Sequence, residues 1–271
     1  MLIRWGWLCP WLAILLAAGV LVAFGLNWWS ALLAALFLVC PALLLWGLYV
    51  TRPQPDEADA PTDGMLMDWT APFYDIYCSA IGLGEGFRAQ TLRVAAIQPG
   101  EKVLDVGCGT GVLTRMAAEA AGKAGSTMGI DPGADMIRVA REKARRTGNA
   151  AGFKVAAIER LPFADAQFDV VLASLMLHHL PPATRRAGLA EVHRVLKPGG
   201  RLVVADFQQP TNLAWWLVLW PFLMMPSVAD NLRGLLPNQI REAGFSRIEI
   251  RGYRAGLITF MTAVKSPQIG G

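Results

Sequence analysis

One segment near the middle of the chain limits the possible folds more than any other, because an apolar strand runs directly into a turn with three glycines. Lys102–Val106 is bulky and β-branched apart from one acid, which suits a strand buried on both faces of a parallel sheet. Gly107, Gly109 and Gly111 let the backbone turn sharply and approach a ligand closely. Residues 112–121 then predict a helix whose N-terminus faces that ligand.

A second short apolar strand strengthens this interpretation. The strand Thr127–Ile130 ends at the carboxylate of Asp131, about 20 residues after the glycine turn. From that position an acid accepts hydrogen bonds from both ribose hydroxyls of a nucleoside, whereas a site for NADP would place an arginine there. A glycine turn alone is weak support because it also occurs in ordinary turns, so Asp131 makes the difference.

The first 51 residues predict a different kind of structure. The chain is 54% hydrophobic and 17% charged, and Trp5 through Thr51 contains no Asp, Glu, Lys, Arg or His. Two spans, 5–26 and 28–50, each approach the ~20 residues that cross a bilayer core. Six of the ten tryptophans lie here, most near span ends, where indole rings prefer the membrane interface. We therefore expect a transmembrane helical hairpin over residues 1–51.

The charges that flank this hairpin predict its orientation. Arg4 and Arg52 stand outside the two spans, so the positive-inside rule places both ends, and the domain that follows, on the cytoplasmic side. A cleaved signal peptide is one alternative, but the apolar region is far longer than an h-region of roughly 7–15 residues. A single long re-entrant helix is the other.

Residues 52–64 contain three prolines and four acids with almost nothing apolar, and predict a linker. The net charge of +4 comes largely from later basic segments such as 138–146, a solvated helix face or a lipid-headgroup patch. We expect a lipid bilayer and a hydrophobic substrate as partners, and no nucleic acid. Four scattered cysteines without C-x-x-C spacing suggest neither a metal site nor a disulfide framework.

Residues 65–271 alternate short apolar runs with amphipathic ones, which predicts an α/β fold: a Rossmann-like, mostly parallel sheet with helices on both faces. Seven strands are expected, the last two forming a hairpin at the edge: 102–106, 127–130, 153–156, 168–173, 201–206, 247–251 and 257–264. Helices are expected at 74–96, 112–121, 134–146, 182–195 and 231–243. Ligands in such sheets bind beyond the carboxyl ends of the strands.

An apolar insertion is expected at about 208–230. Its stretch 215–226 has twelve residues, too few to span a bilayer. Because it follows a carboxyl strand end, we expect it to cover the crevice and to offer Trp215 and Trp216 to an oily substrate. The alternative is a core helix packed on the sheet.

Several blocks in the expected order make residues 65–265 resemble the class I S-adenosylmethionine-dependent methyltransferases, and within them the ubiquinone/menaquinone C-methyltransferase group. The blocks are Val103 to Gly111; Gly129-Ile130-Asp131-Pro132 with Met136; Leu161-Pro162-Phe163 followed by Phe168-Asp169-Val170-Val171; Leu177-His178-His179-Leu180; and Arg194 to Leu202 with its Leu-Lys-Pro-Gly-Gly turn. The resemblance implies S-adenosylmethionine as cofactor.

The resemblance also assigns roles. Gly107 and Gly109 would contact the methionine part of the cofactor and Asp105 its ammonium group, while Asp131 would bind the ribose. The remaining cofactor-binding candidates are Tyr74 in the segment that closes over the site, Cys108 in the turn, and Pro132, Met136, Ile158 and Glu159 around adenine. One position departs from the family pattern: Ala157 stands where an acid commonly accepts from the adenine amino group. A backbone carbonyl or Glu159 is then left for that role.

His178 and His179 follow the fourth strand, where the acceptor should enter, and are the catalytic candidates because imidazole titrates near neutrality. For each, a structural role weighs about equally, and the second is expected to pack or cap the next helix. Asp206, at the end of the fifth strand, is either a substrate contact or a cap. An amine acceptor need only be neutral, and then no dedicated base is required.

The sequence thus predicts a membrane-anchored methyltransferase that acts on a quinone precursor, a phospholipid amine or a small lipophilic phenol or thiol. An NAD(P)-dependent oxidoreductase is the alternative, disfavoured because Val112 stands where a G-x-G-x-x-G pattern would continue. A non-catalytic membrane module that binds the same cofactor is a third possibility, left open by Ala157.

Overall fold

The computed structural model describes residues 57–219, 223–224 and 226–267. The chain divides into two units, Met1–Gln54 and Pro55–Gly271. The predicted hairpin of residues 1–51 lies outside the described residues. Among the residues that are described, no helix is both long and apolar enough to cross a membrane.

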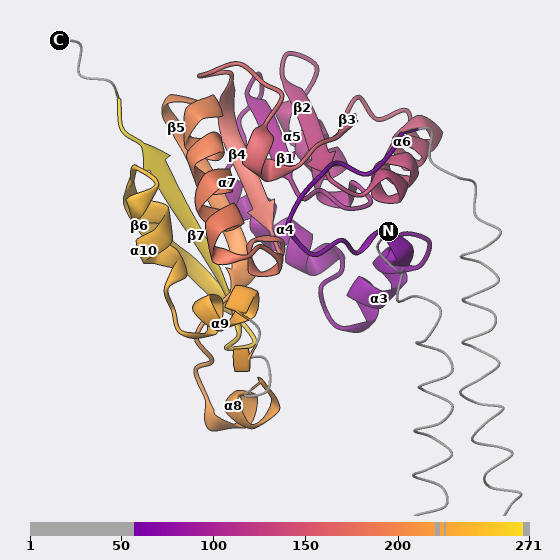
Figure 1. Ribbon diagram of the computed structural model, residues 1–271. Coiled ribbons are helices and arrows are strands. Elements are labelled where there is room, and N and C mark those ends of the chain that lie inside the picture. The colour runs from indigo at the N-terminus through magenta and orange to yellow at the C-terminus, as the bar shows by residue number, and fades with distance from the viewer. Residues whose placement is uncertain (1–56, 220–222, 225, 268–271) are drawn as a thin grey trace, which may run out of the picture. The chain divides into compact units, whose positions relative to one another are not determined.

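The second unit is built on a seven-stranded sheet in the order β3-β2-β1-β4-β5-β7-β6 (Figure 1). Strands β1 to β5 run parallel, and β7 is antiparallel to both β5 and β6, so the predicted sheet with its terminal hairpin is confirmed. The strands are β1 (Lys102–Val106), β2 (Ser126–Asp131), β3 (Gly152–Val155), β4 (Phe168–Ser174), β5 (Leu196–Phe207), β6 (Phe245–Arg254) and β7 (Ile258–Lys265).

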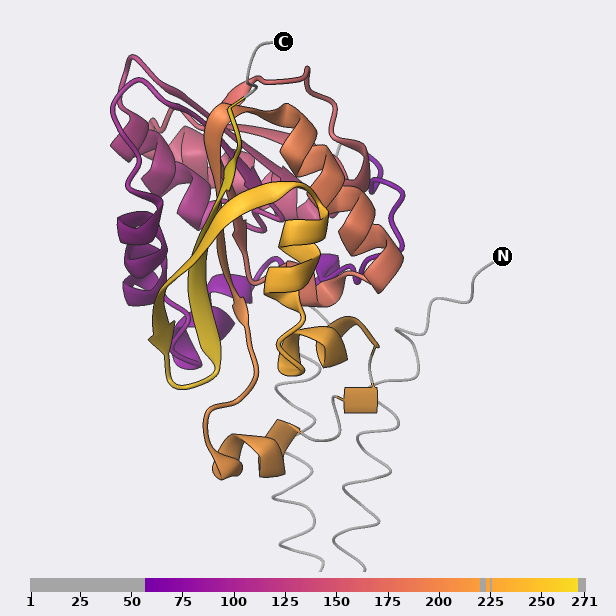
Figure 2. The same cartoon turned by 90° about the vertical axis from the view of Figure 1, so that its left-hand side faces the viewer.

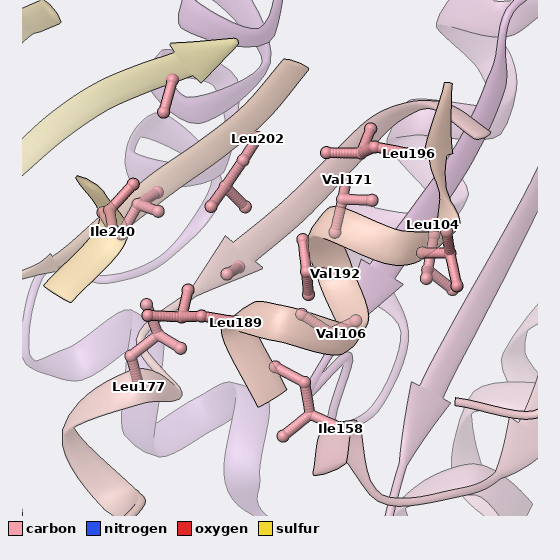
Figure 3. Close-up of a cluster of buried hydrophobic side chains, with 14 of the residues drawn as sticks. Leu104, Val106, Ile158, Val171, Leu177, Leu189, Val192, Leu196, Leu202 and Ile240 are labelled. Atoms are coloured by element: carbon pink, nitrogen blue, oxygen red, sulfur yellow. The ribbon is translucent and has the colours of Figure 1, made fainter. Parts of the chain in front are cut away.

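Helices cover both faces of this sheet, because alternate side chains of each buried strand point to opposite faces. On one face Val103 and Val170 pack against α4 (Glu85–Ala95) and α5 (Val112–Ala121). On the other, Leu104 and Val171 pack with α7 (Pro182–Val195) and α10 (Leu236–Glu242) in a larger core (Figure 3). Figure 2 shows the two helical layers on either side of the sheet. Helix α6 (Ala134–Thr147) covers the end of the sheet around β3.

Two predicted helices are each divided in two. The helix expected at 74–96 consists of α3 (Tyr74–Ala80) and α4, separated by a turn in which Gly82 has a φ of +81°. The helix expected at 231–243 consists of α9 (Pro226–Leu232) and α10, separated at Gly234, whose φ is +74°. The predicted helical segment at 74–96 is thus confirmed as two helices, whereas the single helix predicted at 231–243 is wrong, because glycines in left-handed conformations end a helix.

Short elements complete the carboxyl end of the sheet: the 3-10 turns η2 (Asp68–Thr70), η3 (Ile158–Arg160) and η4 (Leu177–His179), and the helix α8 (Leu213–Leu219) in the insertion after β5. In Figure 1 and Figure 2, α3, α8 and α9 all lie toward this end. The carboxyl ends of β1, β2 and β4 are adjacent in the sheet, so the loops that follow them share one region.

Candidate active site

The glycine turn after β1 is shaped by close packing. Gly107 has a φ of +68°, and a Cβ at this position would lie 2.7 Å from the Cβ of Met176, which follows β4. The backbone N–H of Cys108 donates to the carbonyl of Ile130 at 2.9 Å and so fixes the turn against β2. Glycine is required here because its backbone adopts this conformation and leaves room for Met176.

Asp131, at the end of β2, lies directly against this turn. One of its oxygens accepts from the N–H of Gly109 and the other from the N–H of Gly133, both at 2.9 Å. Burial raises the pKa of Asp131 to about 6, although the two backbone hydrogen bonds act in the opposite direction and lower it. The structure thus brings Asp131 and the glycine turn together, and each oxygen keeps lone pairs for a further donor.

The described part of the predicted linker is packed on the domain and does not stand free. We call residues 57–67 the strap; it is the indigo trace beside α6 in Figure 1. Asp59 accepts from the N–H of Ala134 at 2.9 Å, which caps the N-terminus of α6. The N–H of Ala60 donates to the backbone carbonyl of Pro132 at 2.9 Å, and the N–H of Met65 donates to the backbone carbonyl of His179 at 3.1 Å.

Asp68, just after the strap, adds a second acid at the same helix end. It accepts from the N–H of Met136 at 3.0 Å. Burial raises the pKa of Asp68 to about 6, and the nearby carboxylates of Asp135 and Asp59 act in the same direction. Asp59 and Asp68 therefore dock this region on the N-terminus of α6.

The strap closes one side of a cleft at the carboxyl ends of the strands. Nine of the predicted site residues line this cleft: Tyr74, Gly107, Gly109, Asp131, Pro132, Met136, Ile158, Glu159 and His179. Residues that sequence reasoning missed complete the wall: Thr62, Gly64, Met65, Leu66 and Met67 of the strap, and Ala156, Leu175, Met176 and Leu180.

A second cleft of about 460 Å³ adjoins the first, since Tyr74, Gly107, Gly109 and Leu175 line both. Asp105 and Cys108 lie in the second cleft together with Arg88 of α4, whose charge no sequence pattern had marked. Burial raises the pKa of Asp105 to about 7, although the Thr114 hydroxyl, which donates to Asp105 at 2.6 Å, lowers it. This cleft therefore offers a carboxyl group and a guanidinium together.

Cys108 and Tyr74 are held in neutral forms. Burial raises the pKa of the Cys108 thiol well above its usual value, so it is not a reactive thiolate. Burial also raises the pKa of Tyr74, the first residue of α3. The neighbouring Asp75 accepts from the Thr110 hydroxyl at 2.5 Å and pairs with Lys143, which ties α3 to both the glycine turn and α6.

The two histidines of η4 have different surroundings. His178 is buried, and its Nδ1 lies 2.7 Å from an oxygen of the fully buried Asp206. Its ring also packs edge-on against Phe207, with centroids 4.6 Å apart. His179 lines the cleft. The first histidine therefore has the packing role that the sequence had suggested for the second.

The electrostatics of this group keep His179 neutral. Burial, and then the neighbouring His178, lower the pKa of His179 to about 4. Burial opposes ionisation of Asp206, but His178 and the backbone N–H of Phe207 keep the pKa of Asp206 below its usual value. At neutral pH the structure thus presents an uncharged imidazole to the cleft and a carboxylate behind it.

Arg185 of α7, which sequence reasoning missed, fixes the position of η4. Its guanidinium is fully buried and donates to the carbonyls of Leu177 at 3.0 Å and Leu180 at 3.1 Å, on either side of the histidines. It also donates to Gln239 of α10 at 3.0 Å and to the carbonyl of Ser227 in α9. One cation therefore joins the histidine turn to the two helices that follow the insertion.

Trp215 and Trp216 do not line either cleft. The indole N–H of Trp215 donates to the carbonyl of Ala255 at 2.7 Å, and the N–H of Thr211 donates to Gly256 at 3.0 Å. These bonds hold the start of the insertion against the turn between β6 and β7. Asp206 likewise faces His178 and the backbone, as a support for η4.

Comparison with known proteins agrees with this geometry. Residues 103–200 match a family model described as a methyltransferase domain. A demethylmenaquinone methyltransferase from a Mycobacterium species is 32% identical over 226 residues, covering 75% of this chain and 94% of that protein. A ubiquinone/menaquinone biosynthesis C-methyltransferase from Burkholderia vietnamiensis is 36% identical over 152 residues, covering 55% of this chain and 61% of that protein.

Among solved structures, a SAM-dependent methyltransferase from Aquifex aeolicus shares the fold, with a TM-score of 0.55 at 20% identity over 66% of this chain and 89% of that chain. A methyltransferase explains the glycine turn, the acid after β2 and the similarity to these relatives. The alternatives of an oxidoreductase and of a non-catalytic module are therefore not required. The chain belongs to the class I S-adenosylmethionine-dependent methyltransferases, and it is an enzyme that uses S-adenosylmethionine as its methyl donor.

Proposed function

We propose that this methyltransferase is anchored in a membrane and methylates a hydrophobic or lipid-associated acceptor. The observation that carries the proposal is the composition of the larger cleft. Its lining combines the glycine turn, Asp131 and Glu159 with apolar side chains, namely those of Met65, Leu66, Met67, Leu175, Met176 and Leu180. A polar cofactor and an oily acceptor therefore each have a suitable wall.

The polar part fits the adenosyl group. Asp131 is placed to accept from the two ribose hydroxyls, because each of its oxygens accepts a single backbone N–H within the described structure. Pro132, Met136 and Ile158 line the same cleft and provide apolar contact for a purine ring. Gly107 and Gly109 bring backbone close to the ligand without a Cβ in the way.

The adjoining cleft fits the methionine end. Asp105 would face its ammonium group and Arg88 its carboxylate, a pairing of opposite charges that suits a zwitterion. Tyr74 lies between the two clefts and Cys108 borders the second one, so both would contact the cofactor where the two ends join. When bound, S-adenosylmethionine supplies a methyl group on a positively charged sulfur.

His179 would act on the acceptor. Methyl transfer is an in-line displacement, so the protein must hold donor and acceptor at near-attack distance, and much of catalysis is positioning. His179 is uncharged at neutral pH and can therefore accept a proton from a hydroxyl or from an activated ring carbon, but its pKa of about 4 makes it a weaker base than the free imidazole that the sequence predicts. His178 and Asp206 would hold the turn that carries His179, through the 2.7 Å contact between their side chains.

An isoprenoid quinone precursor is our first choice of acceptor, ahead of a phospholipid amine or a small lipophilic phenol or thiol. The support is the apolar wall formed by Met65, Leu66 and Met176, together with the names of the two relatives, which concern ubiquinone and menaquinone. The long apolar tail of an isoprenoid quinone matches such a wall.

The acceptor is tested with the purified full chain, a membrane lipid extract and methyl-labelled S-adenosylmethionine, followed by mass spectrometry of the labelled product. We expect one labelled lipophilic product, lost in Asp131→Ala and retained in a control such as Asp63→Ala, which alters an exposed strap residue. Label found only in water-soluble molecules would contradict the proposed acceptor class.

The membrane anchor rests on the uncharged stretch from Trp5 to Thr51. Exposed apolar side chains on α3 also suit a position near lipid, since Ile76 is 74% and Tyr77 55% exposed. We expect the full chain to stay with membranes after alkaline carbonate extraction, and protease added to the cytoplasmic side to cleave the catalytic unit. Release into the carbonate supernatant would exclude an integral anchor.

A further inference from the structure

The purine end of the cleft raises a specific question about recognition. Adenine carries an exocyclic amino group, a hydrogen-bond donor that needs an acceptor in the protein. The loop after β3 supplies Ala156, Ala157 and Ile158, none of which has a polar side chain. The carbonyl of Ala157 already accepts from the N–H of Arg160 at 3.3 Å. The acceptor is therefore not one of these three side chains, and one nearby carbonyl is in use.

Among the side chains of this loop, Glu159 is the one that can accept a hydrogen bond in the cleft. It lies in η3 and lines the cleft together with Met136 and Ile158. Its Oε2 is fully withdrawn from solvent and accepts no hydrogen bond from any described residue. Leaving a buried carboxylate oxygen without a donor is costly, so such an atom at a ligand site is expected to be satisfied by the ligand.

We propose that Glu159 selects adenine by accepting a hydrogen bond from its exocyclic amino group at Oε2. This inference rests on the proposed placement of the cofactor in the cleft. It gives the chain a way to recognise adenine although Ala157 lacks the acid that the family pattern places there. The selectivity for adenine would then depend on Glu159 in η3, two positions after Ala157.

The test compares two ligands that differ in the purine C6 substituent and in N1, which accepts a hydrogen bond in adenine and donates one in hypoxanthine. S-adenosylhomocysteine carries the amino donor, whereas S-inosylhomocysteine carries an oxygen acceptor in its place and would set two acceptors face to face. We expect the wild-type chain to bind the adenosyl ligand at least about 10-fold more tightly, as measured by calorimetry. Glu159→Gln keeps the shape of the side chain, and its amide can donate to the inosyl oxygen.

In Glu159→Gln we expect affinity for S-adenosylhomocysteine to fall about 10-fold and affinity for S-inosylhomocysteine to hold or rise, so that the preference largely disappears. Binding of the inosyl ligand also shows that the variant is folded. Glu242→Gln, which removes an exposed acid on α10, is the matched control and should keep the wild-type preference.

The outcomes are distinguishable. An unchanged preference in Glu159→Gln overturns the role of Glu159 while the cofactor site stands. An equal loss of both ligands also overturns it, because the side chain would then only support the loop. If the wild-type chain binds neither ligand, the proposed cofactor placement fails and this inference fails with it.

Discussion

Replacing Asp131 with asparagine should make the unliganded protein relatively more stable as pH rises, while weakening cofactor binding. The reason is the burial of a carboxylate whose pKa is raised from 3.8 to about 6. A raised folded-state pKa contributes stability that is complete below pH 3.8 and is lost as pH rises through 6. Ionisation of Asp131 therefore destabilises the unliganded fold, and we attribute the presence of this carboxylate to its role in ligand binding.

The magnitude follows from the shift. At pH 8 the whole shift of about two units opposes folding, which corresponds to about 3 kcal/mol. At pH 5 the folded-state group is mostly protonated, and the corresponding cost is roughly half of that at pH 8. The asparagine variant would have no such dependence, although it gives up one of the two backbone hydrogen bonds at every pH, at about 1–3 kcal/mol. The difference between the two pH values is thus the quantity to measure.

Denaturant unfolding of the full chain without ligand, at pH 5 and pH 8, measures this difference. We expect Asp131→Asn to gain on the order of 1 kcal/mol of stability relative to wild type between the two pH values. Asp63→Asn, at an exposed position, should show none of this gain. At pH 7.5 the same Asp131 variant should bind S-adenosylhomocysteine about 10- to 100-fold more weakly. A stability change that is equal at both pH values, or larger at pH 5, would refute the reasoning.

Three further predictions concern other parts of the site. His179→Gln should lower kcat about 10²- to 10⁴-fold for a phenol or carbon acceptor, with little change in cofactor affinity. In the wild-type chain, protonation of His179 should lower kcat only when the pH approaches 4. An unchanged kcat in the variant would show that His179 is not the base. Arg185→Met should lower the free energy of unfolding by about 3–5 kcal/mol, because the carbonyls of Leu177 and Leu180 around η4 lose their donor. Arg185→Lys should lower it less. A decrease under about 1 kcal/mol in Arg185→Met would show that the guanidinium does not hold this turn. Gly111→Ala should lower the free energy of unfolding by several kcal/mol, because the φ of Gly111 is +74° and the new Cβ would lie 2.6 Å from the Phe153 ring. Gly199 has a similar φ but open space around it, so Gly199→Ala should lower the free energy of unfolding by only about 1–2 kcal/mol. Equal decreases in the two variants would mean that packing plays no part.

The sheet could be predicted because its signals are local. The strand Lys102–Val106 and the helix Val112–Ala121 begin and end where hydrophobic pattern and glycines place them. Asp131 could be predicted for the same reason, since a strand end after an apolar run has a fixed position in a parallel sheet. The two divided helices could not, because Gly82 and Gly234 interrupt patterns that otherwise continue.

The strap could not be predicted because its composition is that of a solvated linker. Its acids become structural only through partners distant in sequence, as when Asp59 caps a helix that begins at Ala134. Arg88 and Arg185 were missed for a related reason: an arginine is usually exposed, and only the tertiary fold shows that these two face a cleft and a buried turn. Trp215 was assigned to the cleft from its chemistry, but its indole N–H bonds the β6–β7 turn.

The arrangement of cofactor and acceptor is tested most directly by a crystal structure of the full chain with S-adenosylhomocysteine. We predict that the ribose hydroxyls lie within hydrogen-bonding distance of Asp131, that the homocysteine end lies between Asp105 and Arg88, and that the sulfur faces the apolar wall beside His179. A ligand bound outside the strap, or with its sulfur directed away from His179, would contradict the proposed site.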